Sequence, residues 1–79
     1  MSIADAVIDR INELCTIRGI TINKLCNISA VPQSTISEFM NGITKSIGIV
    51  NLKMLCDGFE LSIAEFFNTD VFKNLEQEI

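Results

Sequence analysis

Residues 33–41 place hydrogen-bonding side chains on one face of a short helical pattern and apolar side chains on the other. The apolar positions are Ile36, Phe39 and Met40, at the spacing of a helix that packs against a core. The opposite face carries the amides, hydroxyls and carboxylate of Gln33, Ser34, Thr35, Ser37, Glu38 and Asn41. A short helix of this kind is suited to reading base edges in a DNA major groove.

Polar outer faces are common on surface helices, so an ordinary helical bundle with solvated Ser, Thr and Gln side chains is the competing interpretation. Two details favour the DNA-binding interpretation. The outer face is mostly uncharged, where a solvated helix typically mixes Lys and Glu. Directly after it come Thr44, Lys45 and Ser46, whose polar groups suit phosphate oxygens.

Helical periodicity and capping residues predict the elements that position this face. Residues 3–18 form an amphipathic pattern with Ser2 as N-cap and Gly19 as C-cap. Thr21 caps a second short helix, which turns three apolar side chains inward: Ile22, Leu25 and Cys26. The third helix begins around Pro32, where proline is tolerated, and ends at the Asn41-Gly42 pair, a strong stop signal.

A loop over residues 43–48 leads to a fourth helix over about 49–58, which we expect Gly58 to close. Ser62 and Glu65 form a capping box for a short fifth helix that runs through Phe66 and Phe67. Residues 1–68 are predicted to form the domain and residues 69–79 a C-terminal helical tail. No strand-like alternation persists, so the fold class is all-α, with five helices and a short C-terminal extension.

The 79 residues fit one domain. With 6 basic and 10 acidic residues the net charge is -4, which argues mildly against binding nucleic acid. The acids concentrate at the two ends, however. Residues 14–56 hold Arg18, Lys24, Lys45 and Lys53 against Glu38 alone, a net +3 around the polar helix. This distribution is compatible with DNA binding through a small electrostatic contribution.

Several classes of protein are disfavoured by residues that the chain lacks. There is no His, the acids are dispersed, and no metal-ligand cluster or Gly-rich phosphate loop is present, so we expect neither an enzyme nor a cofactor. Cys15, Cys26 and Cys56 fall at apolar helical positions and are expected to be buried free thiols in a reducing cytoplasm. No transmembrane segment or signal peptide is recognisable, which predicts a cytoplasmic location.

The chain resembles the phage repressor and Cro-like helix-turn-helix family over about residues 7–67. The similar stretches read I-N-E-L-C-T-I-R-G-I-T, then L-C-N-I-S-A-V-P-Q-S-T-I-S-E-F-M-N-G, then L-K-M-L-C-D-G-F-E-L-S-I-A-E-F-F. The resemblance implies a five-helix repressor-like DNA-binding domain, with the helix-turn-helix at helices 2 and 3 and residues 33–41 as the recognition helix. Its partner would be double-stranded DNA.

By position, the resemblance implies base contacts from Gln33, Ser34, Thr35, Ser37 and Glu38. Gln33 is the strongest candidate, because its amide can bond adenine at N6 and N7 together. Glu38 could accept from cytosine N4, or it could face solvent and repel phosphate. Contacts to the DNA backbone are expected from Thr21, Asn23, Lys24, Asn41, Thr44, Lys45 and Ser46, although Lys24 and Arg18 are more readily interpreted as surface charges.

The chain departs from the family at several positions. Ile22 replaces a frequent Gln that contacts phosphate and supports the recognition helix. Cys15 and Met40 stand where some members have a buried Arg–Glu pair, which indicates an apolar contact instead. Ala30 occupies a turn position that is often Gly, at a cost of roughly 1 kcal/mol if that residue needs positive φ. With about two to four phosphate-facing cations, weak monomer binding and a shallow salt dependence are expected.

The tail carries Val71, Phe72, Leu75 and Ile79, which could form the seam of a homodimer or fold back as a last layer of core. The leading hypothesis is a sequence-specific transcriptional regulator, a repressor that acts as a homodimer. The alternative is a protein-interaction module on the same fold, of the antitoxin or anti-repressor type, with little direct DNA binding. The sequence specifies neither the operator nor the inducing signal.

Overall fold

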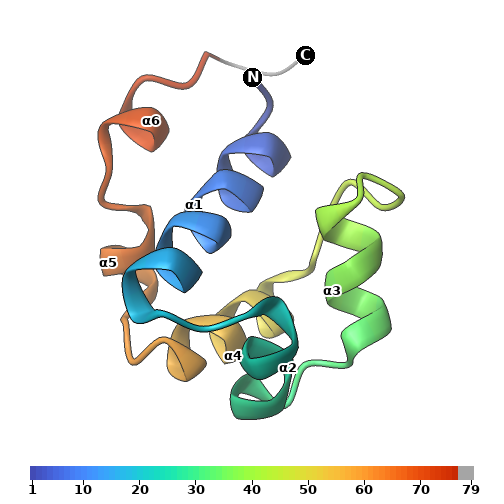
Figure 1. Ribbon diagram of the computed structural model, residues 1–79. Coiled ribbons are helices and arrows are strands. Elements are labelled where there is room, and N and C mark those ends of the chain that lie inside the picture. The colour runs from blue at the N-terminus through green and yellow to red at the C-terminus, as the bar shows by residue number, and fades with distance from the viewer. Residues whose placement is uncertain (77–79) are drawn as a thin grey trace.

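A computed structural model describes residues 1–76, which form six α-helices and no strand (Figure 1). The helix α1 crosses the centre of the molecule, with α5 and α6 on one side of it and α3 on the other in this view. The helices are α1 (Ile3–Arg18), α2 (Ile22–Ser29), α3 (Gln33–Met40), α4 (Ile49–Gly58), α5 (Ile63–Phe67) and α6 (Asp70–Lys73). The expected all-helical class is confirmed.

Side-chain caps set the starts of three helices where the sequence predicts them. Ser2 and Asp5 form a capping box for α1, and Ser62 and Glu65 form one for α5, each side chain accepting from the other residue's backbone N–H. The Thr21 hydroxyl accepts from the Lys24 N–H over 3.1 Å and caps α2. At its other end α1 stops at Gly19, whose φ of 65° is left-handed.

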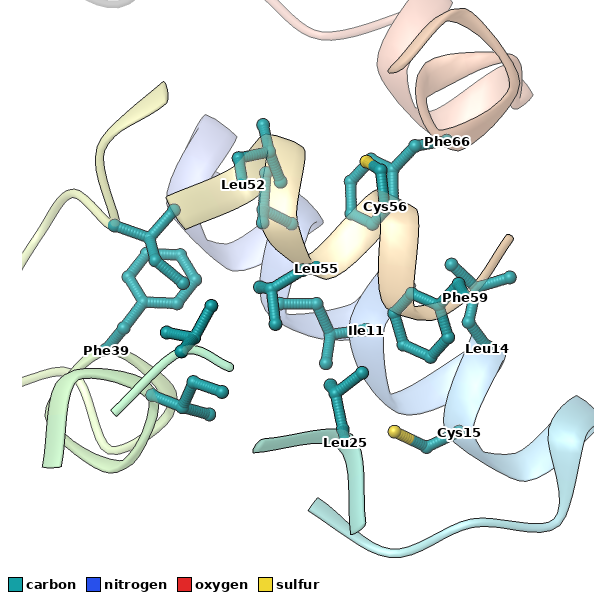
Figure 2. Packing of buried hydrophobic residues seen from close by; sticks show 14 of the residues in the cluster. Ile11, Leu14, Cys15, Leu25, Phe39, Leu52, Leu55, Cys56, Phe59 and Phe66 are labelled. Carbon is teal, nitrogen blue, oxygen red and sulfur yellow. The ribbon is translucent and has the colours of Figure 1, made fainter. Parts of the chain in front are cut away.

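One apolar core joins the first five helices (Figure 2). Its largest fully buried side chains include Phe39 from α3, Leu25 from α2 and Ile11 from α1. Figure 2 shows Leu55 of α4 between Phe39 and Ile11 of α1, and Cys56 of the same helix beside Phe66. The core therefore ties α3 to α4 and α1, and it fixes which face of α3 is turned to solvent.

The fourth helix ends at Gly58, but not for the expected reason. Gly58 keeps helical geometry, and the left-handed residue is Glu60, with φ 60°. The N–H of Leu61 reaches the carbonyl of Cys56 over 2.9 Å around this turn. Gly58 is needed for close packing instead, because a Cβ there would lie 3.0 Å from Cβ of Ser29 on α2. The helix thus ends at Gly58 as predicted, and the left-handed residue of the turn that follows is Glu60.

The described part of the tail folds back onto its own domain. Its helical turn covers only Asp70–Lys73, so Leu75 lies beyond the helix, and Ile79 lies outside the described residues. The Phe72 ring meets the Phe67 ring edge to face, with centroids 4.7 Å apart, and also lies near Phe66. This aromatic packing, worth about 1 kcal/mol beyond burial, holds α6 against α5.

Candidate nucleic-acid interface

The third helix has the predicted two faces. Ile36 and Phe39 are fully buried and Met40 is partly buried against the same core. Gln33, Ser34, Ser37 and Glu38 are exposed, and Thr35 is half-buried. Pro32 precedes the first helical residue and supplies no side-chain cap, so the first N–H groups of α3 have no side-chain acceptor. The helix therefore turns amide, hydroxyl and carboxylate groups toward solvent.

The turn between α2 and α3 is tight and contains a strained residue. Ala30 has φ 61°, in the left-handed region, so the cost of about 1 kcal/mol expected for a residue other than Gly applies. The neighbouring Val31 is buried and anchors the turn to the core. The Ser29 hydroxyl donates to the carbonyl of Leu25 over 2.6 Å, which satisfies a buried polar group at the end of α2.

A hydrogen bond that sequence reasoning did not predict links the two helices. Nε2 of Gln33 donates to Oδ1 of Asn23 over 2.7 Å. Both side chains are exposed. The family resemblance implies that Asn23 faces the DNA backbone, whereas its side-chain oxygen is engaged with the leading candidate for base contact. The two residues lie in different helices, ten positions apart, so no periodicity within one element could have signalled the pair.

The segment after α3 stays close to the end of that helix. The carbonyl of Glu38 accepts from the N–H of Ile43 over 2.9 Å and from that of Thr44 over 3.3 Å. Asn41 donates through its side-chain amide to the Ser37 hydroxyl. The Ser46 hydroxyl accepts from the Gly48 N–H. Exposed side chains in this region include those of Asn41, Thr44, Lys45 and Ser46.

The start of α2 contributes the remaining expected contacts. Thr21, Asn23 and Lys24 are exposed. The Thr21 oxygen is used as an acceptor by its own helix, which leaves its O–H free to donate. Ile22 is half-buried and packs against the core. An apolar, core-facing residue cannot replace a Gln in contacting phosphate.

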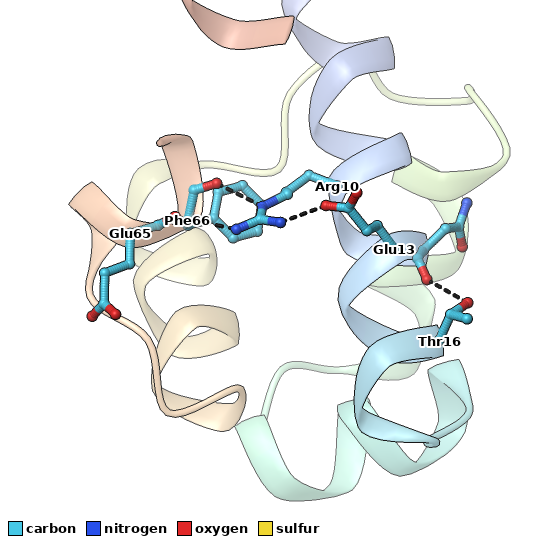
Figure 3. Close-up of polar contacts among 6 residues, drawn as sticks. Arg10, Glu13, Thr16, Glu65 and Phe66 are labelled. Atoms are coloured by element: carbon cyan, nitrogen blue, oxygen red, sulfur yellow. Dashed lines mark hydrogen bonds and ion pairs between the residues drawn. The ribbon is translucent and has the colours of Figure 1, made fainter. Parts of the chain in front are cut away.

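Two of the six basic residues are engaged within the fold. Figure 3 shows Arg10 of α1 between Glu13 and the end of α5. Its Nε donates to the Phe66 carbonyl over 2.8 Å, its Nη2 to the Glu65 carbonyl over 3.2 Å, and its Nη1 pairs with Glu13. Lys53 pairs with Asp57 one turn along α4. Within residues 1–76, Arg18, Lys24, Lys45 and Lys73 form no ion pair.

The three thiols lie inside the core and form no disulfide among the described residues. Burial raises the pKa of Cys15, Cys26 and Cys56, so all three stay neutral near pH 7. Met40, at the end of α3, is partly buried against the same cluster as Cys15, and no ion pair joins α1 to α3 in residues 1–76. In this part of the chain no group of His, Cys, Asp or Glu could hold a metal ion.

These features define a class of protein. A short helix, anchored by two buried side chains and preceded by a tight turn and a bracing helix, is a helix-turn-helix of the kind that binds DNA. A family model for the Cro/C1-type helix-turn-helix DNA-binding domain matches residues 10–70. The chain belongs to this family and is a DNA-binding regulatory protein, not an enzyme.

Two further comparisons yielded no relative. No curated protein and no solved structure is similar enough to the chain to count as a match. As for the membrane, residues 1–76 contain no helix with both the length and the apolar character needed to cross a bilayer.

Proposed function

We propose that this protein is a sequence-specific repressor that reads the DNA major groove with α3. The observation that carries the proposal is the exposed, mostly uncharged face of that helix. Gln33, Ser34 and Ser37 offer both donors and acceptors there, and Ile36 and Phe39 hold the opposite face in the core. The described tail lies on the far side of α1 from α3 and leaves this face open (Figure 1).

The proposed contacts divide between bases and the DNA backbone. Base contacts come from Gln33, Ser34, Thr35, Ser37 and Glu38, with Thr35 reaching from its half-buried position. Around them, hydroxyl, amide and ammonium groups would position the duplex without reading its sequence. These backbone contacts come from Thr21, Asn23, Lys24, Asn41, Thr44, Lys45 and Ser46.

A single α3 covers few base pairs, so we propose that the protein binds two half-sites as a homodimer. Of the candidate seam residues, Val71 is exposed and Leu75 half-buried, whereas Phe72 is engaged in the intramolecular aromatic cluster. Within this proposal residues 1–68 are the DNA-binding unit and residues 69–79 the tail. Repression requires only that the bound dimer block access to its site. We place the protein in the cytoplasm, where DNA and a reducing environment coincide.

The proposal is tested by selecting bound sequences from random double-stranded DNA. The wild-type chain should enrich a short symmetric motif, and Gln33→Ala should lose preference at one position of each half-site. Asn12→Ala, which removes an exposed amide from α1, serves as the matched control and should retain the motif. Equal binding of the wild-type chain to all sequences at low salt would contradict the proposal.

A second candidate function is supported by exposed apolar side chains in the segments that follow α3. Ile43, Ile49 and Val50 are 73, 69 and 70 % exposed, in the loop after α3 and the first turn of α4. Such side chains suit a protein partner better than phosphate. The alternative, a protein-interaction module of the antitoxin or anti-repressor type, predicts a stoichiometric protein partner in a pull-down and no shift of DNA at about 50 mM salt.

A further inference from the structure

The side chain of Gln33 is held in place by the preceding helix. Its Nε2 donates to Oδ1 of Asn23 over 2.7 Å, and the bond joins the first turn of α3 to the first turn of α2. Because both residues are exposed, the bond restrains Gln33 without burying it. Ile22, one residue before Asn23, packs against the core and has no polar group with which to do this.

The bond leaves Gln33 with a defined set of unused hydrogen-bonding groups. A glutamine amide has an oxygen acceptor and two N–H donors on one nitrogen. One N–H is given to Asn23, so the amide retains its oxygen and a single donor. In the major groove adenine presents a donor at N6 beside an acceptor at N7, which matches this pair of groups.

The other three bases do not match the free acceptor and single free donor of the Gln33 amide. Guanine presents two acceptors, O6 and N7, and would require both N–H donors of Gln33. Cytosine offers only a donor at N4, and thymine only an acceptor at O4 beside a methyl group. Of the four bases, guanine is the one whose readout depends on whether the second N–H is free. Asn23 therefore decides between adenine and guanine.

We propose that Asn23 is a positioning residue that makes Gln33 select adenine over guanine, and that it does so without touching a base. This inference rests on the proposed function, because it assumes that α3 reads DNA. The bond to Gln33 uses the side-chain oxygen of Asn23, an acceptor, and leaves its Nδ2 amide available as a donor to phosphate. By taking one N–H of Gln33, Asn23 thus contributes specificity against guanine.

The test compares the sequence preferences of wild type, Asn23→Ala, Gln33→Ala and the double variant. The position at which Gln33→Ala loses its preference identifies the base that Gln33 reads. At that position Asn23→Ala should lower the adenine-over-guanine ratio by about fivefold, the effect of one neutral hydrogen bond, and leave the other positions unchanged. In the Gln33→Ala background the added Asn23→Ala change should have no effect on that ratio.

Two controls separate positioning from a contact of Asn23 itself. Asn27→Ala removes an exposed amide one turn further along α2 and should leave the ratio unchanged. Asn23→Asp keeps an acceptor for Gln33 and should keep the adenine preference, although the added negative charge weakens binding to every sequence. Retention of the ratio in the Asn23→Asp variant and its loss in the Asn23→Ala variant together support the positioning role.

The inference is overturned if Asn23→Ala weakens all sites equally, or if its effect persists in the Gln33→Ala background. Either result would assign Asn23 a direct contact to the DNA backbone. Failure of the proposed function is distinguishable, because the wild-type chain would then select no motif at all. Circular dichroism and thermal unfolding of each variant check that the fold is intact.

Discussion

At the scale of single residues, two backbone positions in the fold are strained. Ala30, between α2 and α3, and Glu60, after α4, have φ of 61° and 60°. The left-handed region crowds the Cβ of an L-residue, whereas Gly adopts it without cost. Glu60 forms no side-chain hydrogen bond within residues 1–76 that would offset the strain. Both positions therefore leave room for stabilisation, and Ala30 lies inside the DNA-binding motif itself.

Replacing either residue by glycine should stabilise the protein. We expect Ala30→Gly and Glu60→Gly each to raise the free energy of unfolding by about 1 kcal/mol, because the strain outweighs the added freedom of glycine in the unfolded chain. Urea denaturation measures the change. Gly19→Ala is the converse control: its φ is 65° and an added Cβ meets nothing within 4 Å, so it should lose a similar amount through backbone strain alone. Unchanged stability in all three variants would contradict the strain assigned to these positions.

At the scale of elements, one side chain of α1 adds hydrogen bonds to α5 beside the packing of Phe66 in the core. Arg10 is only 15 % exposed and donates to the carbonyls of Phe66 and Glu65, which end a helix of five residues. Carbonyls at a helix C-terminus lack partners and carry partial negative charge, so an arginine is well suited to them. Arg10 also lies over the Phe66 ring, 5.9 Å from its centroid. Arg10 thereby stabilises the fold and is not available to bind DNA.

Removing this contact should loosen the fold and leave the DNA-binding face intact. Arg10→Ala is expected to lower the free energy of unfolding by about 2 kcal/mol, through lost charge-assisted hydrogen bonds and lost packing on Phe66. Arg10→Lys should recover part of this, since an ammonium cannot reproduce the planar arrangement of donors.

The matched control for Arg10 is Arg18→Ala. Arg18 is an exposed arginine on the same helix without an ion pair, and its removal should change stability by no more than about 0.5 kcal/mol. Chemical denaturation compares the variants. Equal losses for Arg10→Ala and Arg18→Ala would contradict the role assigned to Arg10.

At the scale of the whole molecule, the basic residues near α3 are separated from most of the acidic residues, and the tail is turned away from α3. The net charge is -4, yet the exposed cations Lys24 and Lys45 lie close to the polar face of α3 in sequence, while most acids lie toward the two ends of the chain. The tail turns α6 onto α5 and away from α3 (Figure 1). Because few cations are available, the affinity for DNA must depend more on hydrogen bonds and less on counterion release than is common for DNA-binding domains.

The salt dependence of DNA binding should reflect this scarcity. With about two to four phosphate contacts by cations per monomer, the slope of log affinity against log salt is expected at about -2 to -4 per monomer. Lys45→Ala should reduce its magnitude by about 1. Lys73→Ala, which removes an exposed lysine from α6 across the molecule from α3, should leave the slope unchanged. The affinity for DNA is measured at several salt concentrations from low to moderate. Equal changes of the slope in Lys45→Ala and Lys73→Ala would contradict the assignment of Lys45 to a phosphate contact.

Most of the helices and the two faces of α3 could be predicted from the sequence alone. Ser2, Thr21 and Ser62 cap their helices, and Ile36 and Phe39 face inward, because caps and helical periodicity act within one or two turns of chain. The exposure of Gln33 follows from the same periodicity. These features are local, so the residues that encode them are neighbours in the sequence.

Only the tertiary structure decided what depends on contacts between distant residues. Arg10 reaches carbonyls more than fifty positions away, Asn23 meets Gln33 across the turn, and Gly58 is required by its approach to Ser29. The same holds for the left-handed Glu60, which replaces the expected role of Gly58 at the end of α4. The physical reason is that these pairs are brought together by helix packing, which no spacing within a single helix encodes.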